Sequence, residues 1–513
     1  MRRQRADSLN RIDPRSDRRC ALADILLTHS YHLHFDAKQV QKMQPYRPLG
    51  TLFAAAALRE CGYDVALFDT MLRNPEEMGE VLERANPRIL VIYEDDFNFL
   101  TKMCLSRMRE IVWKFTSLAR DRSIPVVVHG SDATDHPELF FENGIDYLLR
   151  GEAESTLVAL CDAIVSNTAT EHIAGLVRRS PQGRTIYPNQ ARASNSSWSR
   201  LPRPALDLTD LAQYRKEWLA AHGYFSVNIV ASRGCPYRCN WCAKPISGDK
   251  FQLRSASEVA EEMRLLKSAA GVQHIWFSDD VFALDHHWVK EFAREVSARH
   301  AAVPFKIQSR ANLMTSQVVG WLKTAGCTEV WMGVESGSQK VLDAMDKGIT
   351  LSQIRDARNR LREADIRACY FLQFGYPGEH WSEIQETIAL VRTTRPDDIG
   401  ISFSYPLPGT LFYERVKAQL GAKRNWIASD DLCILFQAEY STDFYRSVRD
   451  ALHAEVTSWR DATPHGMEAV EVLWQRVEVL EAAERENVKT RRGDVPITSF
   501  DFVNTDELTG TEA

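Results

Sequence analysis

Apolar and polar residues alternate in blocks along the first third of the chain. Short apolar runs occupy 23–30, 63–70, 88–95, 124–131 and 146–152, and longer stretches with helical character separate them. Strands that alternate with helices form a parallel sheet with both faces covered. Residues 23–168 are therefore predicted to form a doubly wound, Rossmann-like α/β domain.

The ligand site of such a domain is expected at the carboxyl ends of its parallel strands. Polar residues and glycines gather where the predicted strands end. The candidates are Asp95, Asp96, Gly130, Ser131, Gly151 and Glu152.

A second alternating series begins near residue 222 and supplies six more apolar strands, most of them followed by a helix. Capping-box pairs predict where three of the helices begin. These pairs are Ser255 with Glu258, Thr350 with Gln353, and Ser382 with Gln385. Six β/α units predict a partial (β/α)6 TIM-type barrel over residues 216–424, with its active site at the C-terminal ends of the strands.

The remaining segments are predicted to be connections and extensions. Residues 169–215 are polar and lack a period, so they are interpreted as a linker that follows the surface. Residues 425–513 are predicted to form a helical C-terminal region with a loose tail. Residues 1–22 are Arg-rich without an apolar segment, which predicts a disordered tail rather than a secretory signal.

Composition narrows the class of protein. The chain has 513 residues, a formal net charge of -6 and 26% charged residues, which is typical of a soluble protein with two or three domains. The sequence has no strongly basic domain of the kind that would favour nucleic acid as a partner. No apolar run approaches the roughly 18 residues of a membrane span. We therefore expect a cytoplasmic protein whose ten cysteines are thiols, metal ligands or catalytic groups.

Three of the ten cysteines crowd into eight residues directly after the first barrel strand. Cys235, Cys239 and Cys242 have the spacing C-x3-C-x2-C. Three thiolates can hold three irons of a [4Fe–4S] cubane and leave the fourth iron open. S-adenosylmethionine (SAM) can chelate that iron, and an electron from the cluster then cleaves SAM to a 5′-deoxyadenosyl radical. Zinc is the alternative, but a structural zinc site needs a fourth ligand, and no second Cys or His pair stands nearby.

The run from Arg233 to Pro245 resembles the signature of the radical SAM superfamily, including the aromatic Trp241 before the last cysteine. Further similarities follow in order over residues 222–412. They are Phe277-Ser-Asp-Asp, Ser309-Arg310, Gly333-Val-Glu-Ser-Gly337 with Lys347-Gly348, Phe374-Gly-Tyr-Pro-Gly-Glu379, and Pro406-Leu-Pro-Gly409.

The resemblance implies that a set of barrel residues contacts SAM. The set is Trp241, Asp279, Asp280, Arg310, Glu335, Gly375 and Gly378. Simpler roles stay open for each. The two aspartates could cap the next helix, Arg310 and Glu335 could form an internal ion pair, and the glycines could serve turns. Tyr237, Arg238 and Asn240 receive no role.

The first domain resembles the cobalamin-binding class of the same superfamily. The similar segments are Arg47-Pro-Leu-Gly50, Gly62-Tyr-Asp-Val65, Asp69, Gly130 and Arg150-Gly-Glu-Ala-Glu154. His129-Gly130 stands where that class usually has Gly-Gly, and the D-x-H-x-x-G pattern for a histidine ligand of cobalt is absent. The implied cobalamin contacts are Asp95, Gly130, Ser131, Gly151 and Glu152. A domain retained only for packing is the alternative, and His29, His32 and His34 are interpreted as surface or loop residues.

The resemblance favours a cobalamin-dependent radical SAM methyltransferase that acts on an unactivated carbon of a small molecule, lipid or peptide. It also implies an electron donor such as flavodoxin or ferredoxin. The alternatives are a radical SAM cyclase, oxidase or rearrangement enzyme without methyl transfer, and a cluster- or cobalamin-responsive sensor. A sensor has no need of the fifth-strand stretch Gly375–Glu379, and we find no second cysteine trio or basic module typical of an RNA methylthiotransferase.

Overall fold

A computed structural model describes residues 23–103, 105–180, 182–187, 201–244, 246–421, 425–428, 433–460 and 464–492. The tails predicted at the two ends, 1–22 and the residues after 492, lie outside these ranges. The chain divides into two compact units, Met1–Gln437 and Ala438–Ala513. The first unit contains both sheets.

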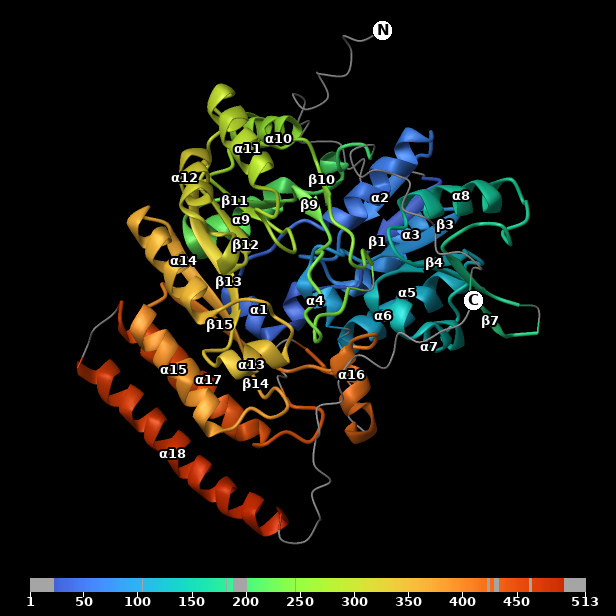
Figure 1. The fold of residues 1–513 in the computed structure, drawn as a ribbon. Helices are drawn as coiled ribbons and strands as arrows, with labels where there is room; N and C mark the ends of the chain where they lie inside the picture. Colours follow the sequence, from blue (N-terminus) through green and yellow to red (C-terminus); the bar gives the residue numbers. More distant parts are fainter. Residues whose placement is uncertain are drawn as a thin grey trace, which may run out of the picture. The chain divides into compact units, whose positions relative to one another are not determined.

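The first sheet has the predicted parallel strands and two more (Figure 1). Its order is β2-β1-β3-β4-β5-β6-β7, with the first five strands parallel and the last two antiparallel. Because β6 and β7 fall within 169–215, the prediction that this whole segment is a linker is wrong. The strands are β1 (Ile25–Thr28), β2 (Val65–Phe68), β3 (Ile89–Tyr93), β4 (Val126–His129), β5 (Tyr147–Leu149), β6 (Leu176–Arg179) and β7 (Thr185–Ile186).

Helices cover both faces of this sheet, as expected for a doubly wound domain. Alternate residues of β1 point into two separate cores: Ile25 and Leu27 pack with one helix pair, and Leu26 packs with the other helices. The first core contains α2 (Leu49–Glu60) and α8 (Glu154–Val165). The second contains α3 (Met78–Ala85), α5 (Ser106–Arg120) and α7 (Pro137–Glu142). Three short helices follow strands of this sheet. Helix α1 (Ala37–Lys42) follows β1, α4 (Phe99–Lys102) follows β3, and α6 (Ser131–Asp135) follows β4.

The second sheet is a six-stranded parallel half-barrel with the order β15-β14-β13-β12-β11-β8. Its outer face packs on helices, as the edge-to-face rings of Phe277, Phe292 and Phe305 illustrate. The strands are β8 (Ser226–Ile229), β11 (His274–Phe277), β12 (Phe305–Ser309), β13 (Cys327–Glu335), β14 (Arg367–Phe374) and β15 (Asp398–Phe403). The helices are α9 (Leu211–His222), α10 (Ala256–Ala269), α11 (His286–Ala298), α12 (Ser316–Ala325), α13 (Gln339–Ala344), α14 (Leu351–Glu363), α15 (Trp381–Thr394) and α16 (Leu411–Val416).

Two of the three predicted capping boxes are present. Ser255 with Glu258 begins α10, and Thr350 with Gln353 begins α14. The third is wrong because α15 begins one residue before Ser382: the carboxylate of Glu383 accepts the backbone N–H of His380 at 2.9 Å.

The second unit contains α17 (Thr442–Ser458) and α18 (Pro464–Arg492), which pack on each other. It starts later than the predicted boundary at 425. Trp426 packs against Tyr405, with 4.2 Å between ring centroids, and Phe436 packs against Phe412 at 5.3 Å, so these residues belong to the barrel unit. Among the residues described, no helix combines the length and apolarity needed to cross a bilayer.

Gly337, which follows β13, packs directly on the backbone of α15. A Cβ atom there would lie 2.5 Å from the Cα atom of Thr387 and would also meet the carbonyl of Glu386. Because neither is a flexible side-chain end, we expect Gly337→Ala to cost about 3 kcal/mol and lower the thermal midpoint by about 5 °C. Gly320→Ala, in α12 with nothing within 4 Å of the added atom, should be neutral or slightly stabilising. Equal midpoints for the two variants by differential scanning fluorimetry would contradict this packing.

Candidate active site

The three cysteines lie on a loop at the C-terminal end of β8. A short hairpin closes the base of the loop, with β9 (Ser232–Arg233) antiparallel to β10 (Gln252–Leu253). Cys235 and Cys239 are half-buried and Cys242 is exposed, and none of the three forms a disulfide bond. Burial raises the pKa of the Cys235 thiol. The arrangement presents the thiols at the end of the barrel where an active site is expected.

A buried carboxylate fixes the start of this loop. Asp279, at the end of β11, accepts the backbone N–H of Ala231 at 3.0 Å and the hydroxyl of Ser232 at 2.5 Å. Burial raises the pKa of Asp279 to about 7, although these hydrogen bonds act in the opposite direction. Its neighbour Asp280 is exposed. Asp279 therefore holds the chain that leads to Cys235, and both of its oxygens already have donors.

Asn240 fixes the middle of the loop from between the second and third cysteines. Its side-chain amide donates to the carbonyl of Ala344 at 2.8 Å and to Asp346, and its oxygen accepts the hydroxyl of Tyr376 at 2.8 Å. Its backbone N–H donates to the carbonyl of Met345 at 3.1 Å. Asn240, for which the sequence predicts no role, thus joins the cysteine loop to the segments after α13 and β14.

Arg310, at the end of β12, lies against the same loop. Its guanidinium stands 3.7 Å from the ring centroid of Tyr237, and one nitrogen is 3.6 Å from the sulfur of Cys239. It also donates to the backbone carbonyl of Lys347. A fixed cation is thus placed beside one of the predicted cluster ligands.

Glu335 ends β13 in an unusual backbone conformation, with φ at +62°. It forms a buried ion pair with Lys347, with 2.6 Å between Oε1 and Nζ. The alternative of an Arg310–Glu335 pair is therefore wrong, because Lys347 takes that place. Gly333 makes room for the pair: a Cβ there would lie 2.7 Å from both charged groups. A left-handed non-glycine residue is costly and often marks a functional site.

The remaining predicted SAM contacts include Trp241, Gly375 and Gly378. The indole nitrogen of Trp241 is buried and has no hydrogen-bond partner among the residues described. Gly375 donates its backbone N–H to Glu379 at 2.6 Å, and the carbonyl of Gly378 accepts from Lys340. The glycines thus line a turn held by Glu379, a fully buried carboxylate whose second oxygen lacks a partner in the described structure.

Across the described ranges, no three His, Cys, Asp or Glu side chains converge as ligands of a single metal ion. In a cubane each thiolate binds a different iron, so its sulfurs lie farther apart than the ligands of one ion. Three thiols with C-x3-C-x2-C spacing, partly open to solvent and outside any disulfide, are chemically suited to bind such a cluster, and Arg310 lies beside one of them, Cys239.

The ends of the parallel strands in the first sheet enclose a narrow cavity. Its lining includes Ser30, Glu94, His129 and Gly130. A Cβ at Gly130 would lie 2.8 Å from the side chain of Glu94. The Nδ1 of His129 and the hydroxyls of Ser30 and Ser131 are buried without partners in the part of the chain described. Free polar atoms around a glycine that tolerates no side chain suit a ligand with amide and phosphate groups.

The other predicted cobalamin residues lie elsewhere along the same edge. Asp95 accepts the backbone N–H of Gly50 at 2.9 Å and so binds the start of α2, and burial raises its pKa to about 7. Glu152 accepts from Gln252 of β10 at 3.0 Å, and Gly151 lies beside the carbonyl of Ile246. Gly151 and Glu152 therefore face the hairpin of the cysteine loop.

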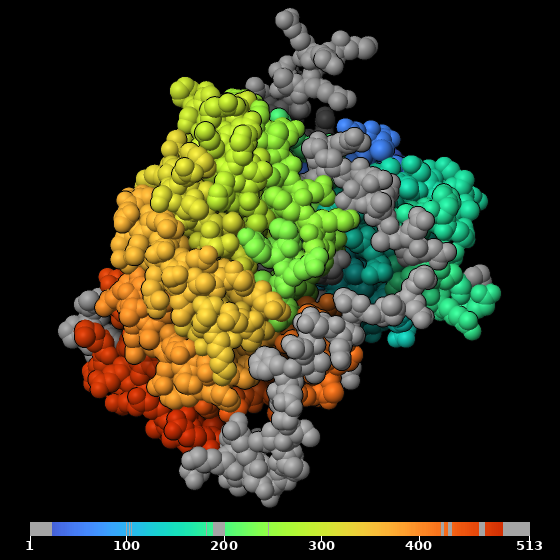
Figure 2. Space-filling model, viewed as in Figure 1, coloured from blue at the N-terminus to red at the C-terminus, as the bar shows by residue number. Residues whose placement is uncertain are grey.

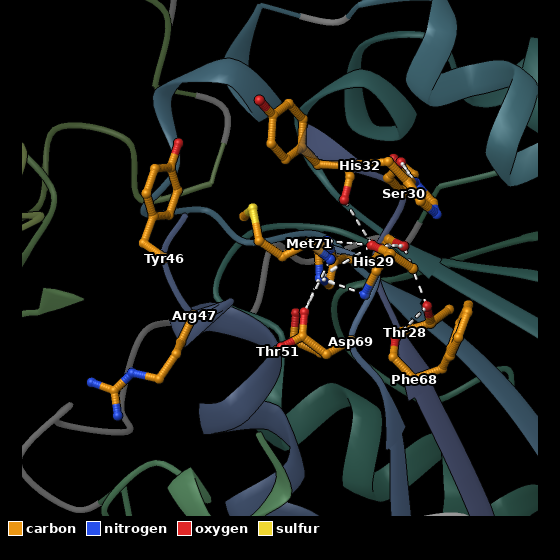
Figure 3. A network of polar contacts seen from close by, with 12 residues as sticks. Thr28, His29, Ser30, His32, Tyr46, Arg47, Thr51, Phe68, Asp69 and Met71 are labelled. Carbon is orange, nitrogen blue, oxygen red and sulfur yellow. Dashed lines mark hydrogen bonds and ion pairs between the residues drawn. The ribbon is translucent and has the colours of Figure 1, made fainter. Parts of the chain in front are cut away.

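A hydrogen-bond network at the ends of β1 and β2 contains His29 (Figure 3). Its Nε2 lies 3.1 Å from Asp69, which also accepts the hydroxyl of Tyr214 at 2.8 Å. His29 and His32 lie in the loop that follows β1, as one of the two interpretations expected, but they are buried, at 1% and 3% exposed, rather than on the surface. Figure 3 shows Arg47 pointing away from this network, and its guanidinium donates to the carbonyl of Asn228 at 2.7 Å.

Along β11 and β12, buried side chains on the helix-covered face alternate with partly buried side chains on the opposite face of the half-barrel. Lys306 lies over the ring of Trp276, 5.2 Å from its centroid, and Trp331 stacks on Phe371 at 4.8 Å. Burial lowers the pKa of Lys306. This face offers aromatic surface and an ammonium group below the cysteine loop.

Two family models match the chain. The radical SAM superfamily model matches residues 229–391, and the B12 binding domain model matches residues 44–161. Together they cover more than half of the sequence, and the cysteine loop lies within the first. The chain belongs to the radical SAM superfamily and carries a B12-binding domain. This radical SAM enzyme therefore uses a [4Fe–4S] cluster, SAM and cobalamin, and it requires a substrate and a reductant.

Relatives and solved structures agree with this assignment. An uncharacterised methyltransferase of Pyrococcus horikoshii is 25% identical over 385 residues, which are 74% of this chain and 80% of that protein. The anaerobic magnesium-protoporphyrin IX monomethyl ester cyclase of Synechocystis is 25% identical and is matched over 62% of each chain. The radical SAM methyltransferase TsrM of Kitasatospora setae, with cobalamin and a [4Fe–4S] cluster bound, has the same fold: the TM-score is 0.65 at 21% identity, over 77% of this chain and 78% of that one.

Glu379 supplies a pH test of this site. Burial raises its pKa to about 8, so the folded state keeps a proton that the unfolded state releases near its ordinary value. Native stability should therefore fall by up to about 1.4 kcal/mol per pH unit between roughly pH 4.5 and 8. Asp95 and Asp279, whose pKa values burial raises to about 7, contribute in the same direction. Glu379→Gln, which mimics the protonated acid, should therefore reduce the fall of the thermal midpoint across that window without abolishing it.

The neighbouring Glu383 is the matched control. Lys340 and other donors lower its pKa to about 2 despite the effect of burial, so it is ionised throughout the same window. Glu383→Gln should lower the midpoint at every pH from 5 to 8 and leave its pH dependence as in the wild type. A Glu379→Gln variant with the wild-type pH dependence would show that Glu379 is already ionised near pH 5.

Proposed function

We propose that this enzyme is a cobalamin-dependent methyltransferase that acts on an unactivated carbon of a small molecule, lipid or peptide. One observation carries the proposal: the strand ends of the B12-binding domain pack directly on the hairpin that bears the cysteine loop. Glu152 contacts Gln252, and Glu154 contacts Arg233, two residues before Cys235. A radical site and a methyl-carrying site placed side by side suit methyl transfer to a carbon radical.

When bound, the cluster supplies the electron that cleaves SAM, and cobalamin carries a methyl group from a second SAM molecule to the substrate. The chain supplies the positions of these groups. Cys235, Cys239 and Cys242 would hold three irons, with Arg310 beside Cys239 to balance the charge of the thiolates. The loop itself is rigid because Asp279 and Asn240 bind it at two points.

The buried pair of Glu335 and Lys347 suits the amino-acid end of SAM. That end carries one ammonium and one carboxylate, so Glu335 would bind the first and Lys347, with Arg310, the second. Within the pair, each group compensates the charge of the other. Trp241 would donate its free indole N–H, and the backbone of Gly375 and Gly378 would approach the adenine.

The B12-binding domain would hold cobalamin at the cavity beside Gly130. The missing side chain of Gly130 makes room for the side chain of Glu94, and Ser30, His129 and Ser131 offer polar atoms that lack partners within the described residues. His129 would act through a hydrogen bond rather than as a cobalt ligand, because its Nε2 lies 2.9 Å from the carbonyl of Gly151. Asp95, Gly151 and Glu152 would act by holding the surrounding loops.

Radical chemistry without methyl transfer is the second candidate. The resemblance to the magnesium-protoporphyrin ester cyclase favours it, because that protein is 25% identical to this chain, the same level as the methyltransferase relative. Such an enzyme would place the cofactors in the same way. A one-electron donor such as flavodoxin or ferredoxin serves either reaction.

The cluster assignment is tested by removing one ligand. Cys239→Ala should reduce the iron content of anaerobically reconstituted protein from about four atoms per chain and abolish 5′-deoxyadenosine, measured by mass spectrometry. Cys369→Ala is the matched control, because Cys369 is a buried thiol of β14 outside the loop. Full iron content and undiminished SAM cleavage in the Cys239 variant would exclude this ligand set.

Methyl transfer is tested by product analysis with methyl-deuterated SAM. The enzyme is incubated anaerobically with cobalamin, a strong reductant and a metabolite extract. A methyltransferase should form S-adenosylhomocysteine and 5′-deoxyadenosine in about equal amounts, together with one product that gains a deuterated methyl group. A cyclase or oxidase should form 5′-deoxyadenosine with S-adenosylhomocysteine at background and no deuterated product, which would overturn the proposed methyl transfer.

A further inference from the structure

Arg233 leaves the barrel and ends inside the B12-binding domain. It belongs to β9 and stands two residues before Cys235, but its side chain is 3% exposed and has its charged partners in the other domain. Its guanidinium donates to Glu154 at 2.6 Å, and its Nε lies 3.6 Å from Asp96. The same group lies over the ring of Phe97, 5.2 Å from its centroid.

These partners come from two loops at the ligand edge of the first sheet. Asp96 and Phe97 follow β3, and Glu154 is the first residue of α8 after β5. One planar guanidinium therefore joins both loops at once, which an ammonium group does less well. Figure 2 shows the green atoms that follow β8 directly beside the teal atoms of the first domain.

The link from Arg233 to the first cysteine is stiff. Gly234 between them has φ at +81°, and a Cβ there would collide with the carbonyl of Lys250 across the hairpin. The partner strand is held on the same side, since Gln252 donates to Glu152. A displacement of Arg233 is therefore expected to move the backbone of Cys235 as well.

We propose that Arg233 is a positioning residue that sets the cysteine loop against the B12-binding domain, so that the cluster and cobalamin keep one relative geometry. This rests on the cofactor sites of the proposed function. Arg233 pairs with Asp96 at the edge of the cobalamin site and is assigned no direct contact with either cofactor in this proposal. It acts through the backbone of the loop on one side and through the loops after β3 and β5 on the other.

The test compares four variants of the full-length, cluster-loaded enzyme. Arg233→Met removes the positive charge, and Arg233→Lys keeps the charge but lacks the planar guanidinium with its several N–H donors. Glu154→Gln removes the negative charge of the ion-pair partner and leaves the sequence of the cysteine loop unchanged. Arg254→Met is the matched control. Arg254 is a buried arginine next to the same hairpin, but its partners, Glu262 and the carbonyl of Val230, lie within the barrel.

The first readout is hydrogen–deuterium exchange of residues 230–254, which contain the cysteine loop, and of residues 150–154 in the first domain. This measurement needs no cobalamin. We expect exchange at least fivefold faster in Arg233→Met and Glu154→Gln on both the loop and residues 150–154, with iron content unchanged. Arg233→Lys should lie between these variants and the wild type. Arg254→Met should speed exchange in the hairpin alone and leave 150–154 protected.

Pulsed electron paramagnetic resonance of the reduced cluster and cob(II)alamin is the second readout. The distribution of distances between the two centres should broaden in Arg233→Met and Glu154→Gln and stay narrow in Arg254→Met. Wild-type exchange in Glu154→Gln, or equal effects from Arg254→Met on both domains, would overturn the proposal. A wild-type enzyme that retains no cobalamin would instead contradict the proposed function, and the exchange data would still decide the role of Arg233.

Discussion

The position of the radical site depends on how a short exposed loop is held at its ends. Loops at the carboxyl ends of parallel strands have no sheet partners of their own, and this one must keep three thiols in place. Asp279 fixes the start of the loop. Its buried carboxylate accepts both a backbone N–H and a hydroxyl from the loop, so the chain cannot shift there without losing both hydrogen bonds. Asn240 fixes the middle of the loop by binding the segments after α13 and β14. The remaining contacts of the site are arranged around a loop that is already fixed.

The sheets could be predicted because their signals are local. Buried parallel strands are apolar on both faces, so β3 and β4 stand out as runs of Ile, Leu and Val. Strand β6, which lies between β5 and the edge strand β7, could not be predicted because it is short and ends in the charged residues Arg178 and Arg179, which leave no clear apolar run. The helix start at α15 was misplaced because His380 lacks the small hydroxyl or carboxylate side chain that usually marks an N-cap.

The candidate site was predictable to the extent that its residues form a pattern in sequence. The cysteine spacing and the strand-end motifs identify Cys235, Arg310 and Glu335 directly. Lys347 belongs to a strand-end motif, but its pairing with Glu335 has no signal in the sequence, because twelve positions and a helix separate the two residues. Arg233 and Glu154 are 79 residues apart in different domains, and no local period connects them. Such pairs exist only once the chain has folded.

The buried contact of Arg233 also bears on how such a two-domain enzyme can change by recombination. A B12-binding domain taken from a relative would bring its own loops after β3 and β5. If those loops lacked carboxylates at the positions of Asp96 and Glu154, the exchange would bury a guanidinium without a counter-charge. The two domains are separate in sequence but not exchangeable modules, and crossover points that preserve function must keep both acidic loops together with the arginine.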